Sequence, residues 1–345
     1  MMCTAREEDW GRLVYDESSD EFEAHVRGGV TDFHVLRPIS AGCLITGRCN
    51  LSCSFCYGNY ESLPGSEISA DRWRRIFGHL FSLGLMRVDL SGGEPTLRRD
   101  LPDIARAATD FGLNTIVSTN GLVLSAEALA KFPPVRWHVS LDSGIPEVHE
   151  NSRLLRILKP SDGSFKKASD FVVRCLRMGH RVRVLTCVGD HNRDLLFALG
   201  EHLVLLGVPE WNISRVLRAG RAQCRYADRW EVSDEYLKEQ VSDLRSTFSF
   251  MRIRYSSRTD QNGYFLLVLP DGALATQYTD GSDKVILAND ALRISAAALQ
   301  NNPLFSLEEH GKKWISAQLD WQPFHQNVAP ALWDPPSSRP FEMTV

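Results

Sequence analysis

Short apolar runs alternate with amphipathic stretches along the chain from residue 39 to residue 222. The stretches between the runs have apolar residues at helical spacing, and several are followed by a glycine, as helices commonly are. The apolar runs have the length of strands and lie at 42–46, 86–90, 114–118, 135–141, 181–188 and 210–214. Strands that alternate with helices predict right-handed βαβ units and a parallel sheet. The pattern therefore predicts an α/β domain of six βα units over 39–222.

The two ends of the chain have different patterns. Residues 1–38 contain few apolar positions and two charged stretches, at 6–9 and 16–21. We therefore expect a polar, loosely packed N-terminal leader over 1–38. Prolines recur through residues 321–345, and this composition predicts a tail that is extended or disordered.

The pattern over 223–320 predicts a small α+β appendage. An amphipathic stretch at 233–248 is typical of one helix, and a second helix is expected at 304–315. Two apolar runs flank a Pro-Asp-Gly turn at 270–272 and predict a hairpin, and 284–288 could add another strand.

Composition narrows the class of protein. The chain has 345 residues, of which 43% are hydrophobic, and this is enough for a sizeable core. Its formal net charge of −4 gives no overall nucleic-acid-binding footprint. No apolar run is long enough to span a membrane, the start lacks the features of a signal peptide, and eight cysteines do not suggest a secreted disulfide framework. We therefore expect a cytoplasmic protein that binds neither nucleic acid nor a membrane.

Three of the cysteines form the most informative motif of the chain. Cys49, Cys53 and Cys56 follow the first predicted strand in a C-x3-C-x2-C run, and no fourth Cys follows closely. Three thiolates on one short loop can hold three corners of a cubane iron–sulfur cluster, which proteins usually hold with four Cys. One iron would then be open to bind another molecule. The spacing alone shows only a loop of three thiolates suited to metal.

Polar residues follow the next predicted strands, at the ends where βα barrels gather their functional sites. Gly92, Gly93 and Glu94 follow the second strand. Paired glycines allow the backbone to approach a ligand closely, and the carboxylate can accept from an ammonium group. The third and fourth strands end in side chains that are equally typical of helix caps and turns: Ser118, Asn120, Ser140 and Asp142.

The Cys motif, with Phe55 directly before its third Cys, and the Gly-Gly-Glu turn together resemble the signature of the radical S-adenosylmethionine (SAM) superfamily. The resemblance implies a partial (β/α)6 TIM-like barrel with one 4Fe-4S cluster on Cys49, Cys53 and Cys56. The open iron would chelate the amino and carboxylate groups of SAM. The reduced cluster would cleave SAM to a 5′-deoxyadenosyl radical, which would abstract hydrogen from a substrate.

The same resemblance implies which residues contact SAM. The Gly-Gly-Glu turn would hold the amino group. Arg153 lies in a stretch similar to one in peptide-modifying members and is the candidate for the carboxylate, although it could also be a surface residue. The expected SAM contacts are Phe55, Gly92, Gly93, Glu94, Ser118, Asn120, Ser140, Asp142 and Arg153.

Cys187 is the candidate catalytic residue of the chain itself. It lies near the end of the fifth predicted strand, where a thiol could donate a hydrogen atom to a substrate radical. A free Cys is also commonly a small buried hydrophobe. His191 is a weaker candidate, as a general base. Three arginines after the sixth strand could hold a carboxylate or phosphate, or remain solvated: Arg215, Arg218 and Arg221.

The hairpin of the appendage resembles the start of the auxiliary-cluster region, called SPASM or twitch, of many radical SAM maturases. In those proteins a Cys typically follows the turn, whereas this chain continues with Ala275 and has no Cys after Cys224. A second cluster is therefore not expected. We expect residues 223–320 to cover the substrate without holding a metal.

Two substrate classes remain open, a ribosomally made precursor peptide and a small metabolite, both within natural-product biosynthesis. An electron donor such as flavodoxin or ferredoxin would be a partner. A different class of function is a passive metal module. This would be an electron-transfer iron–sulfur protein, or a structural zinc site whose fourth ligand is His34 or Cys43.

Overall fold

The computed structural model describes residues 5–16, 20–26, 35–58, 60, 65–155, 161, 163–225, 229–257, 262–279 and 284–315. The proline-rich tail expected at 321–345 lies outside the described residues. Within the described part of the chain, no helix combines the length and the apolar character needed to cross a lipid bilayer.

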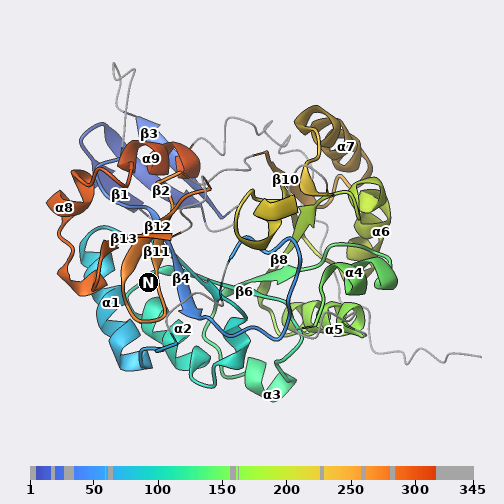
Figure 1. The fold of residues 1–345 in the computed structure, drawn as a ribbon, viewed down its shortest axis with the longest axis horizontal. Helices are drawn as coiled ribbons and strands as arrows, with labels where there is room; N and C mark the ends of the chain where they lie inside the picture. Colours follow the sequence, from blue (N-terminus) through green and yellow to red (C-terminus); the bar gives the residue numbers. More distant parts are fainter. Residues whose placement is uncertain are drawn as a thin grey trace, which may run out of the picture.

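The framework of the described residues is one curved sheet of ten strands (Figure 1). Its order is β10-β9-β8-β7-β6-β5-β4-β11-β12-β13, and the strands from β4 to β10 are parallel. The parallel strands are β4 (Ser40–Thr46), β5 (Arg87–Gly92), β6 (Asn114–Thr119), β7 (Arg136–Ser140), β8 (Arg181–Val188), β9 (Glu210–Arg215) and β10 (Arg252–Ser256). The remaining strands are β11 (Leu266–Val268), β12 (Leu274–Gln277) and β13 (Lys284–Ala288).

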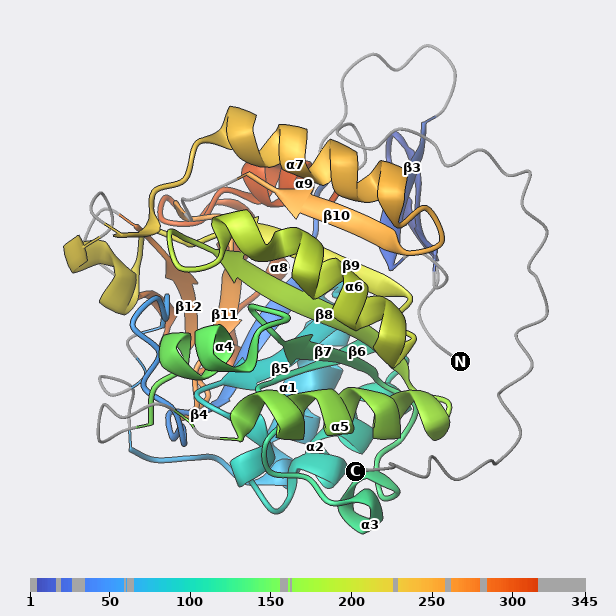
Figure 2. The same cartoon turned by 90° about the vertical axis from the view of Figure 1, so that its right-hand side faces the viewer.

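Helices connect the parallel strands and cover the outer face of the curved sheet (Figure 1 and Figure 2). The first helix, α1, packs on the sheet through the apolar stripe that helical spacing predicts, which consists of Trp73, Ile76, Phe77 and Leu80. The Ser69 hydroxyl caps the start of this helix. The described helices are α1 (Ala70–Ser82), α2 (Leu101–Asp110), α3 (Ala126–Leu129), α4 (Pro146–Ser152), α5 (Ser164–Arg177), α6 (Leu196–Leu206), α7 (Asp234–Thr247), α8 (Ala296–Gln300) and α9 (Leu307–Ile315).

The predicted α/β class with a parallel sheet is confirmed, and β4 to β9 are the six strands expected from the sequence. The parallel sheet nevertheless continues one strand further. β10 lies within the segment assigned to the appendage and pairs in parallel with β9, Ile253 opposite Trp211. Its sequence, Arg-Ile-Arg-Tyr-Ser, contains no apolar run, and its Arg254 pairs with Glu21 at 2.8 Å. The sequence analysis missed this strand because its arginines interrupt the run of apolar residues by which a buried strand is recognised.

The hairpin predicted in the appendage is present, but it extends the main sheet. β11 pairs in parallel with β4, Leu266 opposite Ala41, and β12 pairs with β11 in antiparallel fashion. The apolar side chains of β11 and β12 are buried in this arrangement. The segment is therefore joined to the barrel by backbone hydrogen bonds along a whole strand.

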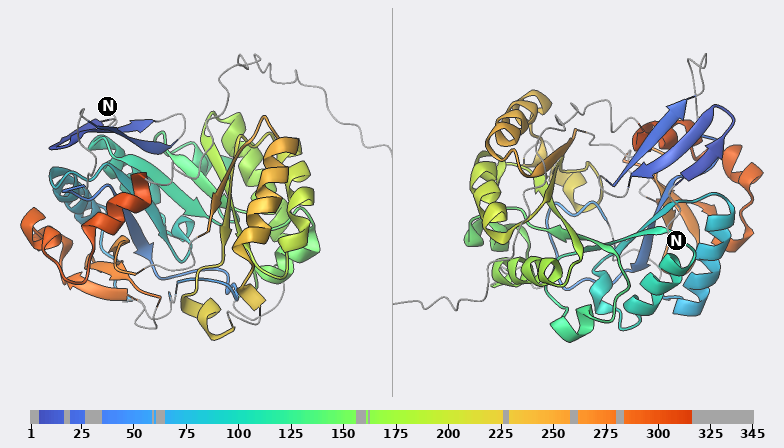
Figure 3. Two further views of the ribbon diagram at one scale, coloured as in Figure 1. Left: turned by 90° about the horizontal axis from the view of Figure 1, so that it is seen from above. Right: turned by 180° about the vertical axis from the view of Figure 1, so that it is seen from behind.

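The N-terminal segment is not loosely packed, contrary to expectation. β1 (Ala5–Glu8), β2 (Gly11–Asp16) and β3 (Glu21–Val26) form an antiparallel sheet, and α9 packs against β3 (Figure 3). Four apolar side chains of this segment are buried: Trp10, Leu13, Tyr15 and Phe22. An antiparallel sheet buries only one face, so few apolar residues are sufficient, and a low apolar content misleads.

Asp20, between β2 and β3, joins this small sheet to the N-terminal ends of the parallel strands. Its side chain is buried and its φ of 58° lies in the left-handed region. The carboxylate accepts from the Tyr15 hydroxyl at 2.8 Å and from Arg183 at 2.7 Å, and it lies 3.4 Å from Arg87. Burial alone would raise the pKa of Asp20, but the charges of Arg87, Arg183 and Arg136 together hold that pKa well below its usual range.

We predict that Asp20→Ala lowers the free energy of unfolding by about 3–5 kcal/mol, because it leaves buried guanidinium groups without their counter-charge. Since the folded-state pKa of Asp20 is depressed, the carboxylate contributes its full stability above pH about 4 and loses it as the pH falls below that value. Urea denaturation at several pH values would measure both effects.

Asp9→Ala is the matched control, because Asp9 is an exposed turn residue of the same small sheet. It should change the free energy of unfolding by less than about 0.5 kcal/mol. Equal losses for the two variants would show that Asp20 does not hold the arginines in place.

Candidate active site

The Cys loop (residues 47–57) follows β4 and walls a cavity of about 260 Å³ at the carboxyl ends of the parallel strands. Cys49, Cys53 and Cys56 all line this cavity. Burial raises the pKa of Cys49 to about 11 and the pKa of Cys56 to about 12, and it also raises the pKa of Cys53. Among the described residues, no three His, Cys, Asp or Glu side chains converge on a single ion. A cubane does not require such convergence, because each thiolate binds a different iron.

The Gly-Gly-Glu turn after β5 is packed directly against the Cys loop. The Gly93 amide donates to the Thr46 carbonyl at 2.9 Å, and the Glu94 amide donates to the Arg48 carbonyl at 2.8 Å. A Cβ on Gly92, whose φ is 125°, would lie 2.3 Å from the Thr46 oxygen, and a Cβ on Gly93 would lie 2.1 Å from the Arg48 oxygen. The glycines therefore permit close contact between two backbone segments, and two of the amides expected to face a ligand are bonded within the protein.

The Glu94 carboxylate is buried and connects this turn to the end of β6. Oε1 accepts from the Thr96 amide and hydroxyl and from the Thr119 hydroxyl, the last at 2.7 Å. Oε2 accepts from the Asn120 amide at 2.8 Å. Burial raises the pKa of Glu94, although these hydrogen bonds oppose the rise. Because Glu94 lines the cavity and Oε2 has a single donor among the described residues, it can accept one more hydrogen bond.

The polar residues at the ends of β6 and β7 also line the cavity, with different partners. The Asn120 amide group donates to Asn50 of the Cys loop at 2.8 Å, which ties β6 to that loop. The Ser118 hydroxyl donates to Asp89 at 2.8 Å. Ser140 faces the same cavity.

Asp142 is buried and is not among the residues that line the cavity. Its two carboxylate oxygens accept from Arg153, with distances of 2.6 Å to Nε and 3.2 Å to Nη2. Arg153 does line the cavity, and its guanidinium lies 5.4 Å from the centre of the Phe55 ring. Asp142 thus holds Arg153, and its expected contact with SAM stays a prediction. Nη1 of Arg153 makes no hydrogen bond within the described structure and remains available to a ligand.

Phe55 is held in an aromatic cluster rather than projecting freely. Its ring stacks on His191 with 5.7 Å between centroids and meets the edge of Trp230 at 5.8 Å. Burial lowers the pKa of His191, and neither ring nitrogen has a hydrogen-bond partner within the described structure. His191 is also absent from the cavity lining, so its observed role is packing, and the general-base hypothesis gains no support.

Cys187 lies on β8 and lines the same cavity as the Cys loop. Its sulfur is 3.9 Å from the Ser214 hydroxyl, and its amide donates to Asp142 at 3.2 Å. Burial raises the pKa of Cys187 to about 11. The group is therefore a protonated thiol at neutral pH, which suits donation of a hydrogen atom better than nucleophilic attack.

The three arginines after β9 do not act together. Arg221 lines the cavity, and its amide donates to the Cys56 carbonyl at 3.0 Å. Arg215 points elsewhere, toward the Ser257 carbonyl at 3.5 Å, and Arg218 is not part of the lining.

Some residues of the cavity were not expected from the sequence: Tyr57, Tyr60, Asp89, Thr119 and Leu185. For Asp89 a signal existed, because it is a lone carboxylate inside the apolar run at 86–90. Of the two candidate zinc ligands, Cys43 is fully buried in the core away from the cavity, and His34 lies outside the described residues. No described residue between 223 and 320 lines the cavity. That this segment covers the substrate stays a prediction.

Comparison with known proteins gives a consistent family. The model of the radical SAM superfamily matches residues 43–247, more than half of the chain. The chain is 40% identical over 94 residues to a PqqA peptide cyclase of Rhodopseudomonas palustris, covering 27% of this chain and 25% of that protein. It is 29% identical over 181 residues to an AdoMet-dependent heme synthase of Methanosarcina barkeri, covering 51% and 50%. The sporulation killing factor maturation protein SkfB of Bacillus subtilis is 26% identical over 201 residues, covering 57% and 47%. The chain thus spans about a quarter to a half of these relatives.

Solved structures resemble the fold over a larger part of the chain. Streptococcus suis SuiB, in its crystal structure bound to the precursor peptide SuiA, gives a TM-score of 0.63 at 14% identity over 79% of this chain and 66% of SuiB. The structure of anSMEcpe with bound AdoMet gives 0.59 at 15% identity over 81% of this chain and 83% of anSMEcpe. At these identities the likeness shows the fold alone.

We predict that Gly93→Ala prevents the Cys loop from closing onto the turn, because the new Cβ would lie 2.1 Å from the Arg48 carbonyl oxygen. The variant should retain the barrel, as judged by circular dichroism, and lose most of its iron after anaerobic reconstitution. Gly65→Ala is the control, since nothing lies within 4 Å of a Cβ at Gly65. Equal iron contents in the two variants would show that the contact with Gly93 is dispensable.

Proposed function

The chain belongs to the radical SAM superfamily, and on that premise we propose that it is an enzyme with one 4Fe-4S cluster on Cys49, Cys53 and Cys56. SAM would bind in the cavity beside the cluster. The observation that carries the proposal is that the three cysteines, Glu94 and Arg153 all line one cavity.

The side chains that line the cavity fit both the 4Fe-4S cluster and SAM. Three thiols on one loop leave one iron of a cubane without a protein ligand. Oε2 of Glu94 can accept from an ammonium group, and Nη1 of Arg153 can donate to a carboxylate. These are the two polar groups of the methionyl part of SAM. Nη1 of Arg153 makes no hydrogen bond within the described structure, and Oε2 of Glu94 accepts a single one there, from the Asn120 amide.

Cys49, Cys53 and Cys56 would hold the cluster, which when reduced would supply the electron for cleavage of SAM and so for hydrogen abstraction from the substrate. The residues of this chain bind SAM and orient it beside the cluster. Glu94 fixes the amino end of SAM, and Asp142 holds Arg153 in the direction of the carboxylate end. Phe55 packs with Trp230 and His191 and shields one side of the Cys loop. Cys187 would return a hydrogen atom to a substrate radical from its S–H bond, and the thiyl radical left behind would regain an electron from the electron donor and a proton from solvent.

For the substrate, we propose a ribosomally made peptide. Two of the relatives are named for peptide modification or maturation, the PqqA peptide cyclase and SkfB, and SuiB was crystallised with a precursor peptide. The small metabolite remains the second candidate, because the heme synthase of Methanosarcina barkeri is similar over half of this chain. A flavodoxin or ferredoxin would deliver the electron in either case, and residues 223–320 would cover the substrate.

We predict that replacing Cys49, Cys53 or Cys56 with Ala abolishes cleavage of SAM to 5′-deoxyadenosine while the barrel remains folded. Anaerobically reconstituted wild-type protein should hold about four irons per chain with matching acid-labile sulfide. About eight irons would contradict a single cluster, and zinc without sulfide would favour the passive metal module. Cys175→Ala, which removes a buried thiol of the core, is the control and should leave both iron and cleavage intact.

We predict that Glu94→Ala weakens SAM binding about 10- to 150-fold, since a charge-assisted hydrogen bond contributes roughly 1.5–3 kcal/mol. Isothermal titration under anaerobic conditions would measure the dissociation constant. Thr96→Val is the control, because it removes one donor to Oε1 and leaves the carboxylate in place. It should weaken SAM binding much less. An unchanged dissociation constant for Glu94→Ala would show that the carboxylate only joins β5 to β6.

A further inference from the structure

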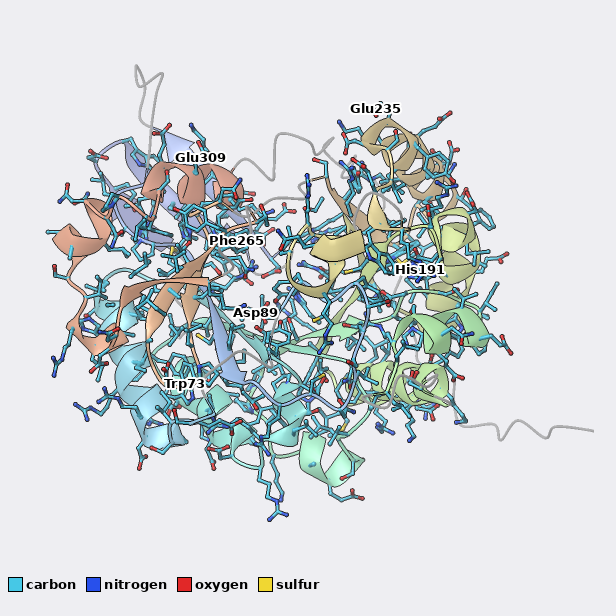
Figure 4. The ribbon with its side chains drawn as sticks, in the orientation of Figure 1. Trp73, Asp89, His191, Glu235, Phe265 and Glu309 are labelled. Carbon is cyan, nitrogen blue, oxygen red and sulfur yellow. The ribbon has the colours of Figure 1, made fainter. Side chains whose placement is uncertain are left out.

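Three side chains of β5 follow one another along one face of the strand, from its N-terminal end to the cavity. Alternate residues of a strand face the same side, and on β5 these are Arg87, Asp89 and Ser91. Arg87 lies at the N-terminal end beside Asp20, and Ser91 lies in the cavity near the Cys loop. Asp89 lies between them, and Figure 4 shows it inside the curve of the sheet, near the centre of the molecule.

Asp89 lines the cavity together with the thiol of β8. The wall is made by side chains of four neighbouring strands: Asp89 of β5, Ser118 of β6, Ser140 of β7, and Leu185 and Cys187 of β8. All of these are partly accessible, although the apolar residues beside them in the strands are buried. The wall is therefore open to a ligand of appreciable size.

One oxygen of the Asp89 carboxylate has no hydrogen-bond partner among the residues that the structure describes. Oδ1 accepts from the Ser118 hydroxyl at 2.8 Å, and Oδ2 accepts no hydrogen bond within the described structure. The one cation whose charge lowers the pKa of Asp89 is Arg87, and burial outweighs it, so that this pKa is raised. The Arg87 guanidinium is itself engaged with Asp20 at 3.4 Å and with the Trp314 ring at 4.4 Å.

The other charged groups of the cavity do not supply the missing partner. Arg153 is bonded to Asp142, and neither Arg153 nor Arg221 acts on the Asp89 carboxylate. Glu94 lies in the turn that follows the same strand, β5, and carries the same charge. Asp89 is partly accessible and lines the cavity, so its unbonded oxygen can accept from a cation or another hydrogen-bond donor that enters there.

We infer that Asp89 is the substrate anchor, and that it binds a cationic group of the substrate, a primary ammonium or a guanidinium. The inference rests on the proposed function and specifies its substrate: for a peptide, the group would be a Lys or Arg side chain. β5 and β8 are separated by β6 and β7 across the curved sheet. A substrate held at Asp89 would occupy the cavity that also contains the Cys187 thiol. Asp89 sets which substrate enters, while Glu94 and Arg153 hold SAM.

The test uses small probes with the full-length, anaerobically reconstituted protein in the presence of SAM and without reductant. Butylammonium and ethylguanidinium represent the cationic groups, and butanol and butyrate are the neutral and anionic controls. Saturation-transfer NMR titrations should show binding of the two cations to wild-type protein and none of butanol or butyrate. Asp89→Asn should weaken cation binding at least about fivefold, as expected on loss of a charge-assisted interaction.

Two further variants separate this site from general surface charge. Ser118→Ala retains the carboxylate and should retain cation binding, and Asp71→Asn, an exposed residue of α1, should have no effect. The inference is overturned if Asp89→Asn binds the cations as tightly as wild type. If Asp89→Asn does not fold, wild-type protein alone decides: equal binding of butanol and butylammonium overturns the inference.

The outcome is distinguishable from failure of the proposed function. Asp89→Asn should retain its iron content and its affinity for SAM, because Asp89 contacts neither the Cys loop nor the Gly-Gly-Glu turn through a hydrogen bond. If the protein binds SAM and holds a cluster but does not prefer the cationic probes, only the role of Asp89 as substrate anchor is refuted. A protein that lacks iron–sulfur and SAM binding refutes the enzyme.

Discussion

The close backbone contact between the Cys loop and the Gly-Gly-Glu turn is the constraint on which the active site depends. Two amide-to-carbonyl hydrogen bonds, from Gly93 and Glu94, seat the loop at the end of the sheet. The contact is possible only without side chains, because a Cβ on either glycine would overlap a carbonyl oxygen of the loop. From this contact follow the position of Glu94, its bonds to β6 and the common cavity of the three cysteines.

Charged groups are paired with one another at the N-terminal end of the barrel, but several polar groups at the carboxyl end have open hydrogen-bonding atoms. At the N-terminal end, arginines from three strands surround Asp20 and Glu210, so that every charge there has a partner. At the carboxyl end, the cavity contains hydroxyls, thiols and carboxylates whose remaining hydrogen-bonding atoms are open. The first arrangement stabilises the molecule and attaches the N-terminal sheet. The second is costly for folding, and ligands would offset its cost.

The structure brings most of the residues singled out from the sequence into one cavity, but it gives some of them partners that the sequence did not reveal. Local motifs placed the three cysteines, Phe55 and Glu94 in the cavity, because each is tied to the end of one strand. Asp142 also follows a strand, yet it points away and holds Arg153, a pairing between residues 11 positions apart that no local pattern reveals. β10 was missed because arginines flank its buried Ile253, and the N-terminal sheet was misjudged because a few apolar side chains are sufficient for its one buried face.

The sequence by itself determined the α/β rhythm, the family and the thiolate loop, because these depend on periodicity and spacing within short segments. Only the tertiary structure decided which polar side chains face the cavity and which atoms remain available there. It also decided that the Asp89 carboxylate lines the cavity with one oxygen that accepts no hydrogen bond within the described structure, because its neighbours there come from several strands. Pairing between distant strands controls the burial of charge, and burial in turn controls what each charged group can bind.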